Sequence, residues 1–278
     1  MKLSSAILRT LLAFVAFCIV QIVAGILIPM KPVAIPHFLQ WLLLSNAVTV
    51  AALAVVAART DWRGWRLGIA IASIPVVIHT LDMLEGIVFL KNSPVEWGRI
   101  FLYTLVSSAL TVPVWMLLFG RRANVATGDD QPISASSPGE RAWKFVVSDV
   151  AYLILYFTAG TIIFPYVKDF YATQYLPPRL TISAVQLLVR GPIFVLLCLF
   201  LFRMLRLPRL SGALAVGAVF TLLSGVAPLL IPNPYFPEVV RWAHFCEVTS
   251  SNFVFGAFVA WLWGQPEPQE ARVLSTAA

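Results

Sequence analysis

The chain has 278 residues, of which 59% are hydrophobic and only 12% are charged. Soluble domains are usually about 45–50% apolar and about 25% charged, so this composition excludes an ordinary water-soluble globule and predicts a lipid bilayer as a partner. The net charge of +7 does not indicate nucleic-acid binding, because the basic residues are scattered over short loops instead of forming one patch.

Eight segments of the chain are long and apolar enough to cross a membrane, which takes about 20 residues. The first segment has no small-residue cleavage site before Pro29, which favours a retained helix over a signal peptide. The composition therefore predicts an all-α, polytopic transmembrane bundle of about eight helices. The predicted helices cover residues 7–28, 38–58, 67–90, 99–119, 145–166, 181–202, 210–231 and 239–263.

One long polar stretch divides the predicted helices into four plus four, and we interpret it as a flexible linker. The halves are weakly similar, because Pro94 to Arg99 opens the fourth segment much as Pro237 to Arg241 opens the eighth. Repeats of four helices would be parallel, with chance similarity as the alternative. The predicted units are a first half at 1–120, a cytoplasmic linker at 121–144, a second half at 145–264 and a cytoplasmic tail at 265–278.

The distribution of basic residues predicts the orientation of the bundle. Thirteen Lys and Arg residues lie in ends and loops on the N-terminal side, and six lie on the opposite side. The positive-inside rule then places both the N- and the C-terminus in the cytoplasm.

Ionisable side chains inside a membrane are costly, so they mark candidate sites. The third predicted helix carries His79, Asp82 and Glu85 at a spacing of three, which keeps neighbours on one drifting face. The eighth carries His244 and Glu247 with the same spacing. Most of these groups fall in the outer half of the predicted bundle.

Two charged residues are the strongest candidates for a binding site because of their predicted depth in the membrane. Arg190 and Glu247 should each lie roughly 14 Å below the outer boundary, where neither can reach water without a partner or a cavity. We predict that they meet there. The predicted binding residues are Arg190, Glu247, His244, Asp82, His79, Glu85, Gln40, Gln186, Asn252 and Arg241.

Three alternatives compete for these residues: a structural network, a metal site, and a proton- or ion-coupled pathway that would use Asp82, Glu247 and Arg190. In a structural network, Arg99, Arg190 and Arg241 would balance the three membrane carboxylates and fix the helices. In a metal site, imidazoles and carboxylates would bind zinc or iron. Neither an HExxH pattern nor a thiolate set is present to identify a metal, and the sequence leaves the cofactor unknown. The metal candidates are His79, Asp82, His244 and Glu247.

The fifth predicted helix places Asp149, Tyr152 and Tyr156 on one face. We interpret its tyrosines as anchors at the membrane interface, where amphipathic rings are common.

Three segments of the second half are distinctive: Leu229 to Asn252, Phe164-Pro-Tyr-Val-Lys-Asp-Phe-Tyr171 and Leu187-Leu-Val-Arg-Gly191. A weaker similarity is present in the first half at Leu84-Glu85-Gly86. They resemble segments of an uncharacterised family of bacterial multi-pass inner-membrane proteins, over about residues 150–264. The resemblance implies a bacterial inner-membrane location, and it assigns no role to any residue.

The leading hypothesis is an outward-facing polar cavity that binds a small molecule, an ion or a lipid headgroup, with transport as the favoured use. A second hypothesis is a membrane enzyme at the outer leaflet with a metal or acid–base site. A third is a structural subunit of a membrane complex. The residue pattern leaves the question of enzyme or carrier open.

Overall fold

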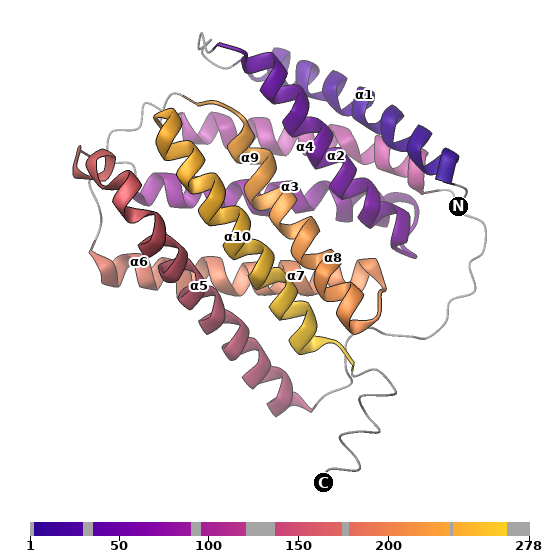
Figure 1. Ribbon diagram of the computed structural model, residues 1–278. Coiled ribbons are helices and arrows are strands. Elements are labelled where there is room, and N and C mark those ends of the chain that lie inside the picture. Colours follow the sequence, from indigo (N-terminus) through magenta and orange to yellow (C-terminus); the bar gives the residue numbers. More distant parts are fainter. Residues whose placement is uncertain are drawn as a thin grey trace.

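The computed structural model describes residues 3–29, 36–89, 96–120, 137–173, 178–233 and 236–265 (Figure 1). Within these ranges the chain is all-α, and eight helical segments are long and apolar enough to cross a membrane. The prediction of an all-α bundle with about eight spanning helices is confirmed.

The first four spans are single helices. The sixth and seventh spans each contain a short π-helical segment, η1 and η2, at which the α-helix is interrupted. In chain order the elements are α1 (Leu3–Leu27), α2 (Phe38–Arg59), α3 (Gly64–Phe89), α4 (Trp97–Phe119), α5 (Pro138–Thr173), α6 (Arg179–Val185), η1 (Gln186–Arg190), α7 (Gly191–Leu205), α8 (Arg209–Thr221), η2 (Leu222–Val226), α9 (Ala227–Leu230) and α10 (Glu238–Trp263).

Within each half, the fourth span packs against the first and the third. In the first half α4 lies against α1 and α3, and in the second half α10 lies against α5 and α8. Any up-and-down four-helix bundle has this arrangement, so the internal repeat stays a prediction. The two halves meet chiefly where α2 packs against α7, η2 and α9.

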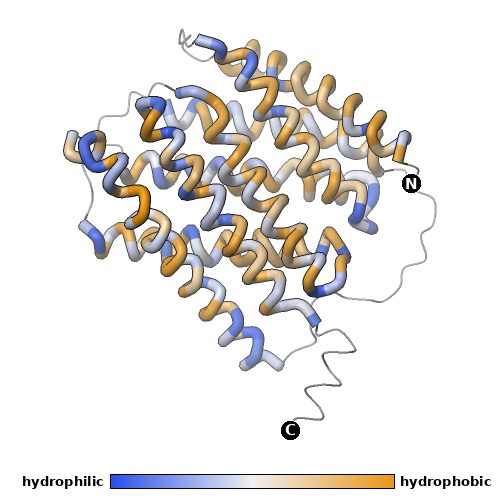
Figure 2. Tube along the Cα trace, in the orientation of Figure 1, coloured by the Kyte–Doolittle hydropathy of each residue, from blue (hydrophilic) through white to orange (hydrophobic). Residues whose placement is uncertain are grey.

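The outer surface of the bundle is apolar. Ile22 and Ile26 of α1 are 64% and 73% exposed, and Leu8, Leu11 and Val15 are also exposed along the same helix. Figure 2 shows hydrophobic residues over most of the length of the helices and hydrophilic residues gathered toward their ends. An apolar surface of this extent would not be stable in water, so it is consistent with a multi-pass membrane protein surrounded by lipid.

Helix α5 differs from its prediction in length. It has 36 residues and begins at Pro138 instead of 145, so the last part of the predicted linker is helical. At 1.5 Å per residue α5 is roughly 54 Å long, well beyond the apolar thickness of a bilayer. An ion pair between Lys144 and Glu140, at 2.7 Å, stabilises its first turns. Residues 121–136 of the predicted linker and 266–278 of the predicted tail lie outside the described residues.

The two π segments have a common cause in the sequence. Each ends two residues before a proline, Pro192 in the sixth span and Pro228 in the seventh. A proline has no N–H to continue the i to i−4 pattern, and the residue before it donates five residues back: Gly191 to the carbonyl of Gln186, and Ala227 to that of Leu222. The widened turn in the sixth span carries two of the predicted site residues.

An aromatic cluster packs against the side chain of Arg190. The ring of Tyr152 lies 5.5 Å from that of Phe194 and 5.1 Å from that of Phe255, and Phe194 in turn lies 4.9 Å from Phe220. The cluster joins α5, α7, α8 and α10, and all four rings are buried. The guanidinium of Arg190 rests over Phe194 at 5.1 Å.

Candidate functional site

The centre of the site is Arg190, which lies in η1 and is 6% exposed. It forms ion pairs with two carboxylates of α3: Nη2 donates to Asp82 Oδ1 at 2.9 Å, and Nη1 donates to Glu85 Oε2. The carboxylates are more open than the arginine, with side chains 30% and 26% exposed. Arg190, Asp82 and Glu85 therefore join two spans that are more than 100 residues apart in the chain. We call these three residues the arginine centre.

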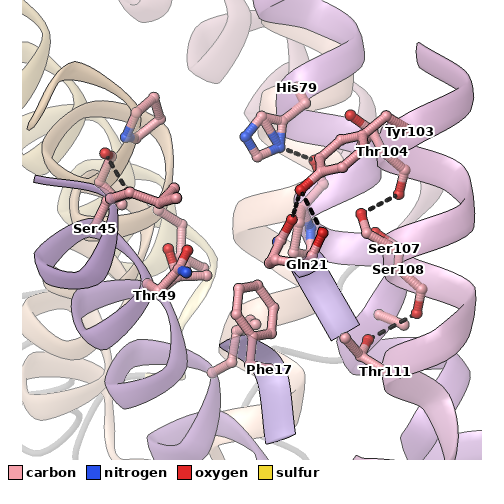
Figure 3. Close-up of a pocket in the computed structure, with 18 of the residues that line it drawn as sticks. Phe17, Gln21, Ser45, Thr49, His79, Tyr103, Thr104, Ser107, Ser108 and Thr111 are labelled. Atoms are coloured by element: carbon pink, nitrogen blue, oxygen red, sulfur yellow. Dashed lines mark hydrogen bonds between the residues drawn. The ribbon is translucent and has the colours of Figure 1, made fainter. Parts of the chain in front are cut away.

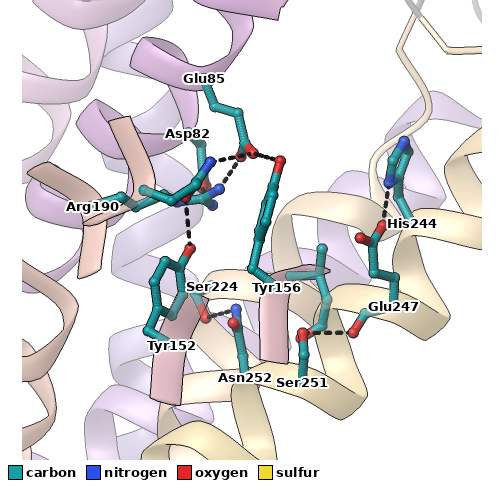
Figure 4. Close-up of polar contacts among 12 residues, drawn as sticks. Asp82, Glu85, Tyr152, Tyr156, Arg190, Ser224, His244, Glu247, Ser251 and Asn252 are labelled. Carbon is teal, nitrogen blue, oxygen red and sulfur yellow. Dashed lines mark hydrogen bonds and ion pairs between the residues drawn. The ribbon is translucent and has the colours of Figure 1, made fainter. Parts of the chain in front are cut away.

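Neutral hydrogen-bonding groups complete the arginine centre (Figure 4). Gln186 Nε2 donates to Glu85 Oε1 at 3.3 Å, and the hydroxyl of Tyr156 donates to the same oxygen at 3.2 Å. The hydroxyl of Tyr152 donates to Gln186 Oε1 at 3.3 Å. The interpretation of these tyrosines as interface anchors is wrong, because Tyr152 is buried and both point into the bundle.

Two buried polar atoms, one in the arginine centre and one on α5, make no hydrogen bond with the described residues. These are Arg190 Nε and Asp149 Oδ1. Asp149 lies on α5 against Gly191, where an added Cβ would collide with its carboxylate and lie 2.8 Å from the Gln186 carbonyl oxygen. Glycine at 191 is therefore required by the close approach of α5 to η1 and α7.

A second centre lies on α10, one face of which presents His244 and Glu247. His244 Nδ1 lies 2.7 Å from Glu247 Oε2, and its Nε2 lies 2.9 Å from the hydroxyl of Tyr171 on α5. A carboxylate can only accept, so Nδ1 carries a proton, and in the neutral imidazole Nε2 accepts from the tyrosine. We call Tyr171, His244 and Glu247 the histidine centre.

Helix α5 brings the two centres close to one another. Tyr156 of α5 reaches Glu85, and one turn further along the same helix a Cβ at Gly160 would lie 3.3 Å from Glu247 Oε1. One helical turn is about 5.4 Å. Arg190 and Glu247 do not meet as predicted: Arg190 pairs with Asp82 and Glu85, while Glu247 pairs with His244.

Two of the arginines expected to balance the membrane carboxylates do not do so. Arg241 is buried, donates to the carbonyls of Leu229 and Leu230, and lies 4.5 Å from the ring of Trp242. Arg99 pairs with Glu96 at 2.9 Å near the start of α4. A closed network of three arginines and three carboxylates is therefore not the arrangement in the structure.

The remaining predicted residues lie in other surroundings. Gln40 is exposed and hydrogen bonds to His37 at 3.0 Å. Asn252 is buried and donates to Ser224 of η2 at 2.8 Å. The Nδ1 atom of His79 lies 2.9 Å from the Pro75 carbonyl, and its ring borders a separate cavity.

The four candidate metal ligands do not converge. Asp82 is paired with Arg190, His244 with Glu247, and His79 with its own helix backbone. Across the described ranges, no group of three or more His, Cys, Asp or Glu side chains is arranged to hold a metal ion. The geometry thus gives the metal hypothesis no support.

Sequence reasoning missed the roles of Tyr152, Tyr156 and Tyr171. A usable signal was present for two of them, because Asp149, Tyr152 and Tyr156 repeat on one helical face with a carboxylate that cannot face lipid. Tyr171 gives no such signal, since only the packing of α5 on α10 places it against His244.

Comparison of the chain with protein-family models, curated proteins and solved structures finds no match.

Proposed function

We propose that the arginine and histidine centres together form a binding site for a small molecule or ion that carries positive charge, and that this site serves transport. The observation that carries the proposal is an imbalance of charge within the two centres. Three carboxylates, Asp82, Glu85 and Glu247, have only one permanent cation, Arg190, among them. An unbalanced negative charge inside a membrane is costly, and a cationic ligand or a proton would neutralise it.

The partial openness of the carboxylates supports binding over a purely structural role. Asp82 and Glu85 are paired with Arg190 but remain accessible along one side. A network that only fixed helix positions would be more stable if it were fully enclosed or replaced by apolar packing. The unpaired Nε of Arg190 and Oδ1 of Asp149 are further groups that a ligand or water could satisfy.

Transport is favoured over static binding because Arg190 lies where the sixth span is interrupted and Glu247 lies at a similar depth on α10. Arg190 is eleven residues from the start of α6, roughly 16 Å along the axis, and Glu247 is nine residues from the start of α10, roughly 14 Å. Charges near the membrane midplane at broken helices are a recurring feature of carriers. The location in a bacterial inner membrane with cytoplasmic termini remains part of the proposal.

Thermal unfolding of the purified protein in detergent tests the binding site. The probes are sodium, potassium, ammonium and choline chlorides, with glucose as an uncharged comparison, all at constant ionic strength. A bound cation stabilises the folded protein by about 2.7 kcal/mol at a hundredfold excess over its Kd. We expect at least one cation to raise the Tm of the wild-type protein and to lose that effect in Glu85→Gln.

Asp61→Asn is the matched control, because Asp61 also pairs with an arginine of a distant span, Arg206, at 2.7 Å but lies outside the site. The control should keep the full cation response. A panel without any cation response, or an equal loss in both variants, would contradict the proposed site. If a response is present, uptake of that cation into proteoliposomes decides whether the site serves transport.

A specific observation favours a second candidate, a membrane enzyme that uses acid–base chemistry. Glu247 orients the imidazole of His244, whose Nε2 faces a hydroxyl, and this order of groups is typical of a general base. Hydrolysis of ester or phospholipid substrates in mixed micelles would support the enzyme if His244→Gln abolished it and His37→Gln did not. His37 is a suitable control because it is exposed and bonded only to Gln40 among the contacts described above.

A further inference from the structure

A cavity of about 160 Å³ lies between α1, α2, α3 and α4, and the seventh span closes it on one side through Leu223 and Ala227 (Figure 3). It is separate from the arginine and histidine centres and shares none of their residues. At about 30 Å³ per water it could hold roughly five waters, and cavities of similar size accommodate a molecule as large as benzene.

Neutral polar side chains line this cavity from several helices. Gln21 comes from α1, Asn46 and Thr49 from α2, and Tyr103 and Ser107 from α4. No Asp, Glu, Lys or Arg is among its lining residues. A charged molecule would lose its hydration there without gaining an opposite charge, so the chemistry of the walls selects for an uncharged occupant.

The donor that most clearly lacks a partner is the indole N–H of Trp115. Trp115 lines the cavity and is 1% exposed, and its Nε1 has no acceptor among the described residues. A buried N–H without an acceptor costs about 1–3 kcal/mol. The Nε1 atom is itself buried behind the cavity wall, so an oxygen atom of a bound molecule satisfies it when the indole ring tilts toward the cavity.

His79 provides a complementary acceptor. Its Nδ1 lies 2.9 Å from the Pro75 carbonyl, and a carbonyl can only accept, so Nδ1 carries a proton. In the neutral imidazole Nε2 is then an acceptor. Figure 3 shows His79 beside the cavity, opposite Ser45 and near Tyr103.

The hydroxyl groups of α4 extend the polar wall deep into the bundle. Ser107 and Thr111 donate to carbonyls of their own helix, at 3.1 Å and 2.7 Å, and their oxygen lone pairs remain available. Tyr103 and Trp115 are twelve residues apart on α4, which is roughly 18 Å along the axis. The cavity is therefore a narrow slot along the helices.

We propose that this slot binds a small uncharged molecule with several hydroxyl or amide groups, of about the size of a three-carbon polyol. Such a molecule is shorter than the slot: near Trp115 it can accept from the indole N–H, near His79 it can donate to Nε2, and along the wall between them it can exchange hydrogen bonds with the hydroxyls. This binding is independent of the cation site, because it uses neither an ion pair nor any of the three membrane carboxylates.

Cysteine accessibility in the full-length protein tests the proposal. Ser108→Cys places a thiol in the wall of the slot, and Cys18→Ala with Cys246→Ala removes two native thiols. Native Cys198 is retained as the matched control, since it is 0% exposed and does not line the slot. The probes are methyl methanethiosulfonate, which is small and neutral, and its trimethylammonium-ethyl analogue, which is cationic. Mass spectrometry counts the modified thiols.

We expect the neutral reagent to modify the S108C thiol at least tenfold faster than Cys198, and the cationic reagent to leave both unmodified. Glycerol should slow the reaction at least threefold, whereas sucrose of equal osmolality, which is too large for the slot, should not. Trp115→Phe should weaken the protection by glycerol, because it removes the N–H that would donate to an oxygen of the ligand.

Three results would each overturn the proposal: a thiol that neither reagent reaches, equal modification by the charged reagent, or a reaction rate that glycerol leaves unchanged. The last result would mean that the slot contains water only. If Cys198 also reacts, the variant is not folded, and the same measurements on Ser107→Cys decide the question.

Discussion

The bundle contains two polar regions that share helix α3 but stabilise their polar side chains within the membrane by different interactions. In the arginine centre, Asp82 and Glu85 share ion pairs with one cation from a distant span. In the slot between α1 and α4, hydroxyls such as those of Ser107 and Thr111 bond to the carbonyls of their own helix. The first arrangement depends on tertiary packing, whereas the second is satisfied locally and leaves oxygens free to face a cavity.

This difference has an energetic consequence. Removal of one member of the arginine centre leaves its partners charged and uncompensated, so the members are strongly coupled. A back-bonded hydroxyl can be removed with little effect on its neighbours. Four substitutions sharpen or break this comparison.

The largest effect is expected for Arg190→Met, which leaves the carboxylates of Asp82 and Glu85 without their cation. We expect a loss of about 3–5 kcal/mol in the free energy of unfolding, measured by denaturation in mixed micelles. Adding Asp82→Asn and Glu85→Gln should recover most of it. A loss as small as that of Arg203→Met, at an exposed position of α7, would show that the arginine centre is not coupled.

A smaller effect is expected for Gly191→Ala, which inserts a methyl group between η1 and α5. The new Cβ would lie 2.8 Å from the Gln186 carbonyl oxygen and would collide with the Asp149 carboxylate, so overpacking should cost about 1–3 kcal/mol. Gly25→Ala is the control, because nothing lies within 4 Å of a Cβ there, and it should be neutral or stabilising. Equal stability of the two variants would contradict the close approach of α5.

Tyr156→Phe removes one hydrogen bond to the Glu85 carboxylate and leaves the ion pairs intact. Hydrogen bonds to charged groups contribute about 1.5–3 kcal/mol, and we expect the lower end because Glu85 keeps two other donors. Tyr166→Phe, at a side chain that is 71% exposed, should change the unfolding free energy by less than about 0.5 kcal/mol. The same denaturation series measures both, and matching values would remove Tyr156 from the site.

The smallest effect is expected for Ser107→Ala in the slot. Its hydroxyl donates only to the carbonyl of Thr104, and single side-chain hydrogen bonds in membrane proteins average about 0.6 kcal/mol. We expect a loss of no more than that in unfolding experiments without added ligand. A loss as large as that of Arg190→Met would show that the slot is structurally coupled and would break the comparison.

Much of the fold could be predicted because its determinants are local. The number of spans follows from apolar segments of sufficient length, and the candidate charges follow from their position inside such segments. The predicted start of α5, residue 145, lies after the observed start at Pro138. Glu140 and Lys144 are typical of a polar linker in the sequence, but they form an ion pair on consecutive helical turns.

The sequence by itself determined that Arg190, Asp82, Glu85 and Glu247 lie within spans and need partners, because the position of a charge along an apolar segment sets its depth, and an unpaired charge at that depth is costly. Only the tertiary structure decided the partners. In the structure Arg190 pairs with two carboxylates of α3, Glu247 contacts His244, and Tyr156 donates to Glu85. Partner choice depends on the rotation and packing of helices far apart in the chain, and equivalent hydrophobic periodicity on several helices allows more than one such packing.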